Sequence, residues 1–466
     1  MKRTLKLGAT ALVVGLLSSA AFAESYGPYP ITEKSYSGDK TNSVSYSGQV
    51  ARNVLVGSLK SLAGKGNGGA NAEELKAQMM AYFAGSEDDL PIIGYTDKEG
   101  FDIKQTTVNE ISSGKDMKGK TYSGLVPGWP GNMTGPEVIE DMITRAAASD
   151  GGFDADTGMD WGQLIQKFSL GAMGFNQAVD NYLDEKLAAD NKPNNKPYGD
   201  GTAYTGKEHS WDEAFGYFGA PAHGLTLQPD QAYNINKRTD VVAADANSDG
   251  VIDLKTEMVF GNAYYAAGAD KGGKTDYFAT ITSAFVEGRK LITSADGEAL
   301  TDAQRDQLKA YAEVIETEWT KVFAEAAFKY AGSVYKDITT LRATEGEEAI
   351  AKAYRDYGKH WGELKGFSMS LQTGKDNLGG TAVRLNRLIG FGPVTLDETV
   401  VTGIDADGNF IKDAKMSWNA YQLNMLKVQD LLVKEFGIED RQNDATSELA
   451  NLIKELDTDS GGAETD

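Results

Sequence analysis

Apolar residues recur at intervals of three and four along most of the chain, the spacing that places them on one face of an α-helix. A clear example is the stripe of Val50, Val54, Leu55, Leu59 and Leu62. Read with the glycine and proline breaks, this periodicity predicts helices over residues 46–62, 71–83, 136–148, 161–189, 209–218, 256–267, 276–293, 302–331, 346–373, 381–389, 417–435 and 444–456.

Alternation of apolar and polar residues, which would indicate strands, is weak throughout. We therefore expect an all-α fold of two packed helical bundles with long loops, and a hairpin or two as the only sheet. Thr301 is expected to cap the helix that follows it, and Gly332 is expected to end that helix. Residues 405–409 are predicted to form a turn.

The same pattern divides the chain into segments. Residues 1–23 are predicted to be a signal peptide and residues 24–45 an extended N-terminal arm. The remaining segments are a first helical half (46–220), a loop region with a calcium-type loop (221–275), a second helical half (276–456) and a disordered tail (457–466).

The first 23 residues have the pattern of a secretory signal. Lys2, Arg3 and Lys6 precede a mostly apolar run, and Ala21 and Ala23 fit the small-residue cleavage motif. Cleavage after Ala23 predicts an exported protein, and we expect the periplasm rather than full secretion. No later segment is apolar for long enough to predict a membrane span.

Charge and cysteine content narrow the chemistry. The formal net charge is −22, which argues against binding to nucleic acid or anionic membranes. There is no cysteine, so a metal site would have to use histidine, carboxylate, carbonyl or water ligands. No nucleophile motif, phosphate loop or dinucleotide fingerprint is present.

Two of the three histidines stand in similar surroundings. His360 has a tryptophan next to it and Glu363 one helical turn on, and His209 likewise precedes a tryptophan, Asp212 and Glu213. This similarity suggests a weak internal duplication. If the two copies met between the bundles, their side chains would suit Zn(II), Fe(II/III) or Cu(II). A solvated or capping pair is the plainer interpretation of either motif, and His223 is expected in a loop, with only a small chance of acting as a third ligand.

Residues 358–363 fit the Gly-x-His-x-x-Glu signature of the imelysin-like proteins, which carries His360 and Glu363. More closely, the chain resembles the imelysin-related family called domain of unknown function 4856. The resemblance implies a bacterial, exported, two-bundle helical protein, from a group once classed as metallopeptidases and linked to iron uptake. The similar stretches are residues 46–52, 157–161 with the helix after it, 209–219, 284–289 and 360–372.

A second candidate site is independent of the resemblance. Residues 245–253 match much of an EF-hand-type calcium loop, in which alternating oxygen ligands wrap the ion and Gly250 allows the sharp turn. The twelfth position is Thr256 instead of a glutamate, and Glu257 comes one residue late. An Asx-rich turn without an ion is the alternative. The expected ligands are Asp245, Asn247, Asp249, Val251, Asp253 and Glu257.

Together these features favour a periplasmic imelysin-like protein that binds a transition metal, iron or zinc, and they favour a binding protein over an enzyme. The expected ligands are His360, Glu363, His209, Asp212 and Glu213. One alternative is a metallopeptidase with Glu363 as general base, although a helical His-Glu-x-x-His motif is missing. The other is a calcium-stabilised interaction protein without a transition metal. The sequence indicates no particular protein partner.

Overall fold

The computed structural model describes residues 25–376 and 378–453 and confirms the all-α fold. The predicted signal peptide and the predicted tail at 457–466 lie outside the described residues. None of the described helices combines the length and the apolar character needed to cross a membrane.

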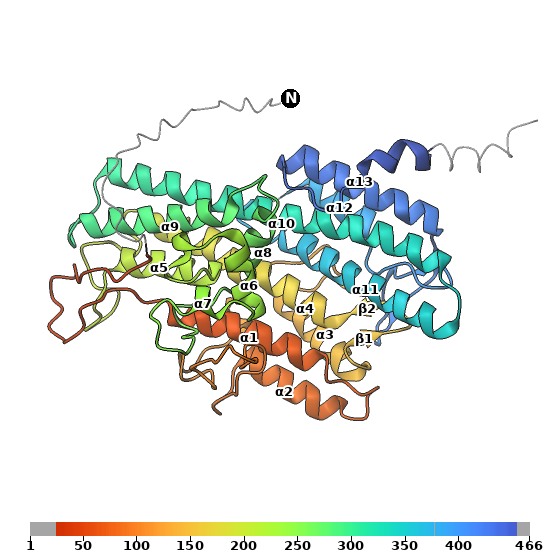
Figure 1. Ribbon diagram of the computed structural model, residues 1–466, viewed down its shortest axis with the longest axis horizontal. Helices are drawn as coiled ribbons and strands as arrows, with labels where there is room; N and C mark the ends of the chain where they lie inside the picture. The colour runs from red at the N-terminus through yellow and green to blue at the C-terminus, as the bar shows by residue number, and fades with distance from the viewer. Residues whose placement is uncertain (1–24, 377, 454–466) are drawn as a thin grey trace, which may run out of the picture.

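The first half of the chain forms the lower layers in Figure 1. Its elements are α1 (Ser47–Ala63), α2 (Ala72–Ala84), η1 (Lys118–Lys120), α3 (Gly135–Ala148), β1 (Phe153–Asp154), β2 (Met159–Asp160), α4 (Trp161–Ser169), the π-helical segments η2 (Leu170–Phe175) and η3 (Gln177–Tyr182), η4 (Glu185–Leu187) and α5 (Gly206–Phe218).

The remaining elements complete the bundle. They are η5 (Gly224–Thr226), α6 (Pro229–Lys237), α7 (Val241–Ala244), α8 (Gly261–Asp270), α9 (Tyr277–Ser294), α10 (Asp302–Ala343), α11 (Glu347–Ser370), α12 (Gly380–Ile389), β3 (Thr399–Val400), β4 (Gly403–Ile404), β5 (Phe410–Ile411), β6 (Ala414–Lys415), α13 (Trp418–Phe436) and η6 (Thr446–Glu448). The strands form three antiparallel two-stranded pairs, β1 with β2, β3 with β6 and β4 with β5.

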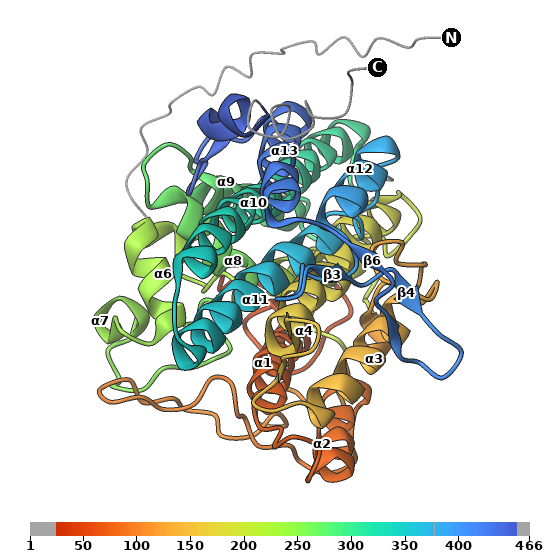
Figure 2. The same ribbon diagram turned by 90° about the vertical axis from the view of Figure 1, so that its right-hand side faces the viewer.

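Two long helices each pack against different partners at their two ends. α10 packs against α9 with its first part and against α11 and α13 with its second, as Figure 1 shows. The helix formed by α4, η2 and η3 without interruption (residues 161–182, the α4–η3 helix) packs against α11 at its start and α5 at its end. In Figure 2, α1, α4, α11 and α10 lie in successive layers.

The main hydrophobic core extends from Tyr26 to Ile438 and contains residues of both predicted helical halves. The predicted N-terminal arm belongs to this core. Tyr26 stacks on Phe215 with 3.7 Å between ring centroids, and its hydroxyl donates to Asp212 at 2.7 Å.

Local sequence explains several helix starts. Thr134 with Glu137, Thr205 with Glu208 and Thr301 with Gln304 form capping boxes before α3, α5 and α10. The predicted N-cap at Thr301 is therefore confirmed, as is the turn at 405–409, which joins β4 to β5.

The main departures from the predicted elements concern length. α10 continues through Gly332 to Ala343. The glycine at this position allows close packing instead of ending the helix, because a Cβ there would lie 2.0 Å from the carbonyl oxygen of Asn443. The predicted loop region 221–275 also contains α6 and α7, whose short apolar stripes were too brief to indicate helices. The helix predicted at 256–267 is present as α8, but it begins at Gly261. The last predicted helix is η6 followed by helical residues 449–453, and the rest of it lies outside the described residues.

Candidate functional site

The signature residues lie on α11, where His360 and Glu363 are one turn apart as predicted. Asp337, from the neighbouring α10, lies beside the imidazole, and its Oδ2 is 2.6 Å from Nδ1 of His360. Burial alone would lower the pKa of His360, but the hydrogen bond and the charge of Asp337 outweigh it and raise the pKa. With Nδ1 held by Asp337, the ring is oriented and Nε2 is its second functional nitrogen.

Glu363 points to the inside of the molecule and meets Lys167 of α4. Their side chains are 8% and 2% exposed, and Oε1 of Glu363 is 3.4 Å from Nζ of Lys167. The same ammonium donates to Gln163 at 2.9 Å and to Gln166 at 2.6 Å. Lys60 of α1 also donates to Gln166, at 2.8 Å. Two lysines and one glutamate thus share a buried polar network between α1, α4 and α11.

The energetics of this network are set by burial. Desolvation and the nearby charge of Lys60 lower the pKa of Lys167 well below its usual value, against the opposing charge of Glu363. Burial also lowers the pKa of Lys60. Strong pKa perturbation of several groups in one cluster is typical of functional sites, although structural ion-pair networks share it.

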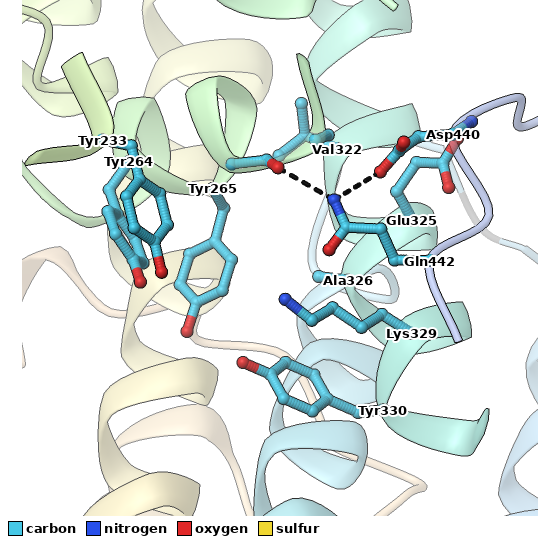
Figure 3. Close-up of a pocket in the computed structure, with 12 residues that line it drawn as sticks. Tyr233, Tyr264, Tyr265, Val322, Glu325, Ala326, Lys329, Tyr330, Asp440 and Gln442 are labelled. Atoms are coloured by element: carbon cyan, nitrogen blue, oxygen red, sulfur yellow. Dashed lines mark hydrogen bonds between the residues drawn. The ribbon is translucent and has the colours of Figure 1, made fainter. Parts of the chain in front are cut away.

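Two tyrosines link this network to a pocket. Tyr330 of α10 is near enough to Glu363 for the charge of Glu363 to affect its pKa, and Tyr265 of α8 lines the pocket with Tyr330 in Figure 3. Burial, and then the charge of Glu363, raise the pKa of Tyr330 well above the usual value, so its hydroxyl is neutral. The Tyr330 ring also lies 6.1 Å from the His360 ring, centroid to centroid.

His209 occupies a different environment, on α5. Its ring stacks on Tyr204 at 4.4 Å and meets the edge of Tyr198 at 4.2 Å, and its Nε2 is 3.7 Å from Oε2 of Glu213. Burial lowers the pKa of His209, which favours the neutral imidazole. Glu213 also accepts a hydrogen bond from Gln49 of α1 at 2.8 Å.

Glu363 and Glu213 lie near opposite ends of the α4–η3 helix. Glu363 faces Lys167 near the start of the α4–η3 helix. At its end, burial and then the charge of Glu213 raise the pKa of Tyr182. Fifteen positions separate Lys167 from Tyr182, which corresponds to about 20 Å of helix. The two similar His-containing stretches thus each place a glutamate beside the α4–η3 helix, but at opposite ends of it, so the two copies do not face each other.

The expectation that His209 and His360 share one metal site is accordingly corrected. Among residues 25–376 and 378–453, no three His, Asp or Glu side chains lie close enough together to hold a metal ion. The long helices α1 and α4–η3 keep the two pairs apart, and periodicity along the chain contains no information on this separation.

Asp212 also has a structural role instead of the predicted ligand role. It is fully buried, its Oδ1 accepts from Tyr26 and from Arg289 at 2.9 Å, and its Oδ2 accepts from the Ser45 amide. Arg289 is held in turn by Glu208 at 3.0 Å. All oxygens of Asp212 are thus occupied by protein donors.

His223 is likewise engaged in local structure. Its Nε2 lies 2.9 Å from the carbonyl oxygen of Ala243, and the residue caps η5. It sits between α5 and α6, as the predicted loop position implied.

The predicted calcium-type loop has the backbone of an Asx-rich turn. Oδ1 and Oδ2 of Asp245 accept from the amides of Asp249 and Gly250, at 3.1 and 3.0 Å. Asp253 is bound by Lys104 at 3.1 Å and by Gln105 at 2.7 Å, so its carboxylate is already neutralised.

Glu257 returns to this loop and accepts from the Asp253 amide at 2.8 Å. Burial, together with the charges of Asp245 and Asp249, raises its pKa despite the opposing hydrogen bonds from backbone amides.

Sequence reasoning missed Lys167, Lys60, Asp337 and Tyr330. One available signal was the placement of Lys167 on a strongly apolar helix, beside Phe168 and one turn after Leu164, where a cation is expected only with a partner. Asp337 and Tyr330 carry no such signal, because they reach the site from a helix that crosses it.

The fold and site define an all-α protein with a buried glutamate–lysine network beside a histidine. A family model described as Domain of unknown function (DUF4856) matches residues 142–378, about half of the chain, and the chain belongs to this family. This match confirms the resemblance to that family, and it spans His209, His360 and Glu363. No curated protein and no solved structure matches the chain.

Proposed function

We propose that this protein is an exported binding protein that holds a transition metal ion, iron or zinc, at His360 and Glu363. Export rests on the signal-like first 23 residues. The metal role rests on the donors that α10 and α11 bring together. The protein donors would be Nε2 of His360, the carboxylate of Glu363 and the hydroxyl oxygen of Tyr330, with water completing the set.

The observation that carries this proposal is the 2.6 Å contact between Asp337 and Nδ1 of His360. Metal-binding histidines commonly donate their second ring nitrogen to a carboxylate, which orients the ring and increases its basicity. Glu363, one turn along the helix, supplies the oxygen that would join Nε2. One imidazole with oxygen ligands suits Fe or Zn better than calcium or magnesium.

Lys167 is the competitor for Glu363 in this proposal. Its ammonium has Glu363 as its nearest carboxylate, at 3.4 Å, and burial lowers its pKa. Metal binding would displace that cation or its proton, and it would also remove the Nε2 proton of His360, whose pKa is raised. Apparent metal affinity should therefore rise with pH across the His360 titration.

The test is calorimetric titration of Zn(II), and of Fe(II) without oxygen, into wild type, Glu363→Gln and His360→Gln. Each substitution should weaken binding at least tenfold, by analogy with the loss of one ligand or its orienting partner. Glu213→Gln is the matched control, because it removes a carboxylate from the other His–Glu pair. Unchanged binding in Glu363→Gln, or equal losses in Glu363→Gln and Glu213→Gln, would contradict the proposal.

The metallopeptidase alternative is less well supported, because a general base must be free to take a proton from water. Glu363 is paired with Lys167, and α11 carries no second histidine.

A calcium ion at residues 245–257 is a separate proposal, supported by the raised pKa of Glu257 beside Asp245 and Asp249. A divalent cation would offset the repulsion among these carboxylates. Millimolar calcium should raise the melting temperature of wild type and leave Asp245→Asn unaffected, and equal melting curves with calcium and with chelator would exclude the site.

A further inference from the structure

A small pocket lies between α6, α8 and α10, and Tyr330 is part of its lining. Its volume is about 40 Å³, and its walls include the rings of Tyr233, Tyr264, Tyr265 and Tyr330. Figure 3 shows the side chain of Lys329 reaching from α10 to the space between Tyr265 and Tyr330. The pocket is thus an aromatic enclosure with an ammonium group directed into it.

Lys329 is partly exposed and has no described carboxylate within ion-pairing distance, although its charge acts on Asp440 in the same lining and opposes the effect of burial on the pKa of that carboxyl. Its Nζ lies 5.8 Å from the centroid of the Tyr330 ring, a weak cation–π contact. Lys237, from α6, lies 5.1 Å from the centroid of the Tyr264 ring. The chain has 68 acidic and 46 basic residues, so an ammonium without an ion-pairing carboxylate is notable in it. An anionic ligand in the pocket would balance this charge.

The two acidic residues of the lining are already occupied. Glu325 accepts hydrogen bonds from the amides of Glu439, Asp440 and Arg441, and so anchors that segment to α10. Asp440 accepts from Gln442 at 2.6 Å. Neither carboxylate is within ion-pairing distance of Lys329.

Tyr233 supplies a second donor. Tyr264 stacks on it with 4.7 Å between ring centroids. Burial would raise the pKa of Tyr233, but the neighbouring Tyr264 and the charges of Lys237, Lys329 and Lys271 lower it.

We propose that this pocket binds the carboxylate end of a small aromatic acid, with Lys329 as its counter-ion and Tyr233 as a hydrogen-bond donor. A volume of about 40 Å³ holds roughly three water-sized groups, which suits a carboxylate and not a whole molecule. The ring of the ligand would lie outward against the tyrosine faces, where stacking is worth about 0.5–1.5 kcal/mol.

The site is independent of the metal proposal. Tyr330 is the one residue common to both, and neither Lys329 nor Tyr233 is expected to touch the metal. Binding is therefore measured on chelator-treated full-length protein, with Glu363→Gln as a second sample that lacks the proposed metal ligand.

The experiment titrates benzoate, benzamide and acetate into the protein and follows heat or tyrosine fluorescence. Benzoate should bind at least tenfold more tightly than neutral benzamide and than acetate, which has no ring. Lys329→Met and Tyr233→Phe should each weaken benzoate binding, the first at least tenfold, whereas Lys309→Met, on the exposed part of α10, should not. Circular dichroism confirms that each variant is folded.

Equal affinity for benzoate and benzamide, wild-type affinity in Lys329→Met, or no binding at millimolar benzoate would overturn the proposal. Retained benzoate binding in Glu363→Gln with loss of metal binding would separate this site from the metal site. Loss of benzoate binding in Lys329→Met with unchanged metal binding would be the converse result, and it would also show that the two sites are independent.

Discussion

The guanidinium of Arg289 is enclosed without solvent contact between two carboxylates. Glu208 and Asp212 lie 3.0 and 2.9 Å from its nitrogens, and the hydroxyls of Ser43 and Thr293 accept further hydrogen bonds from it. Burial disfavours the charged guanidinium, but Asp212 and then Glu208 more than compensate and raise the pKa of Arg289. This cluster ties the N-terminal segment to α5 and α9.

Arg289→Met should therefore destabilise the protein by about 3–5 kcal/mol, because it leaves two carboxylates buried without a cation. Urea unfolding followed by circular dichroism measures the change. Arg384→Met is the control: it removes an exposed ion pair with Glu435 and should cost less than about 1 kcal/mol. Similar losses for both variants would contradict the prediction.

His360 and Asp337 form the other residue-scale feature with a measurable consequence. The folded pKa of His360 lies above the unfolded value of about 6.5. The pair's contribution to stability is therefore full below pH of about 6.5 and is lost as the pH rises through the folded pKa.

Asp337→Asn should lower the His360 pKa and reduce the free energy of unfolding by on the order of 1 kcal/mol at pH 6, and by less at pH 9. NMR titration of the His360 ring and urea unfolding at both pH values test this. Asp356→Asn, which breaks an exposed pair with Lys352 on the same helix, should change neither. An unchanged His360 titration in Asp337→Asn would show that the carboxylate does not hold the imidazole.

At the scale of elements, the site depends on how closely α11 approaches α4. A Cβ on Gly366 would lie 2.4 Å from Cβ of Lys167, and one on Gly358 would lie 2.1 Å from the carbonyl oxygen of Gly158. These glycines let the backbones approach, and that closeness allows Lys167 to reach Glu363. Glycine is otherwise unfavourable within a helix, by about 1 kcal/mol relative to alanine.

Gly366→Ala should accordingly destabilise the protein by about 1–3 kcal/mol, since overpacking outweighs the gain in helix propensity. Gly380→Ala, at the start of α12 with no neighbour within 4 Å, is the matched control and should be neutral or slightly stabilising. Thermal unfolding compares the two variants. A stabilised Gly366→Ala would mean that α11 and α4 are less tightly packed than described.

At the scale of the whole molecule, the α4–η3 helix belongs to the first predicted half and α10 to the second, and the main hydrophobic core contains residues of both. Neither half can unfold without exposing apolar surface of the other. The two helical halves predicted from the sequence are thus regions of one packed unit in the described residues.

Thermal unfolding should consequently proceed in a single cooperative step, in which fluorescence of buried residues such as Trp211 and Trp361 changes together with helical circular dichroism. Differential scanning calorimetry gives the decisive measurement. Two resolved heat-absorption peaks, or helix loss that precedes the fluorescence change, would indicate independently folding halves.

The sequence by itself determined the helices and the family. Amphipathic periodicity and capping residues act over one or two turns, so α1, α3, α9 and α11 could be predicted nearly to their ends. The one-turn spacing of His360 and Glu363 is equally local and is present in α11.

Only the tertiary structure decided which side chains meet. Lys167, Asp337 and Tyr330 come from other helices, and their positions beside α11 depend on crossing geometry that local spacing does not encode. The same holds for the separation of His209 from His360, because both α1 and the α4–η3 helix run between their sites. Local hydrogen bonding therefore determines the elements, whereas side-chain packing between distant segments determines the site.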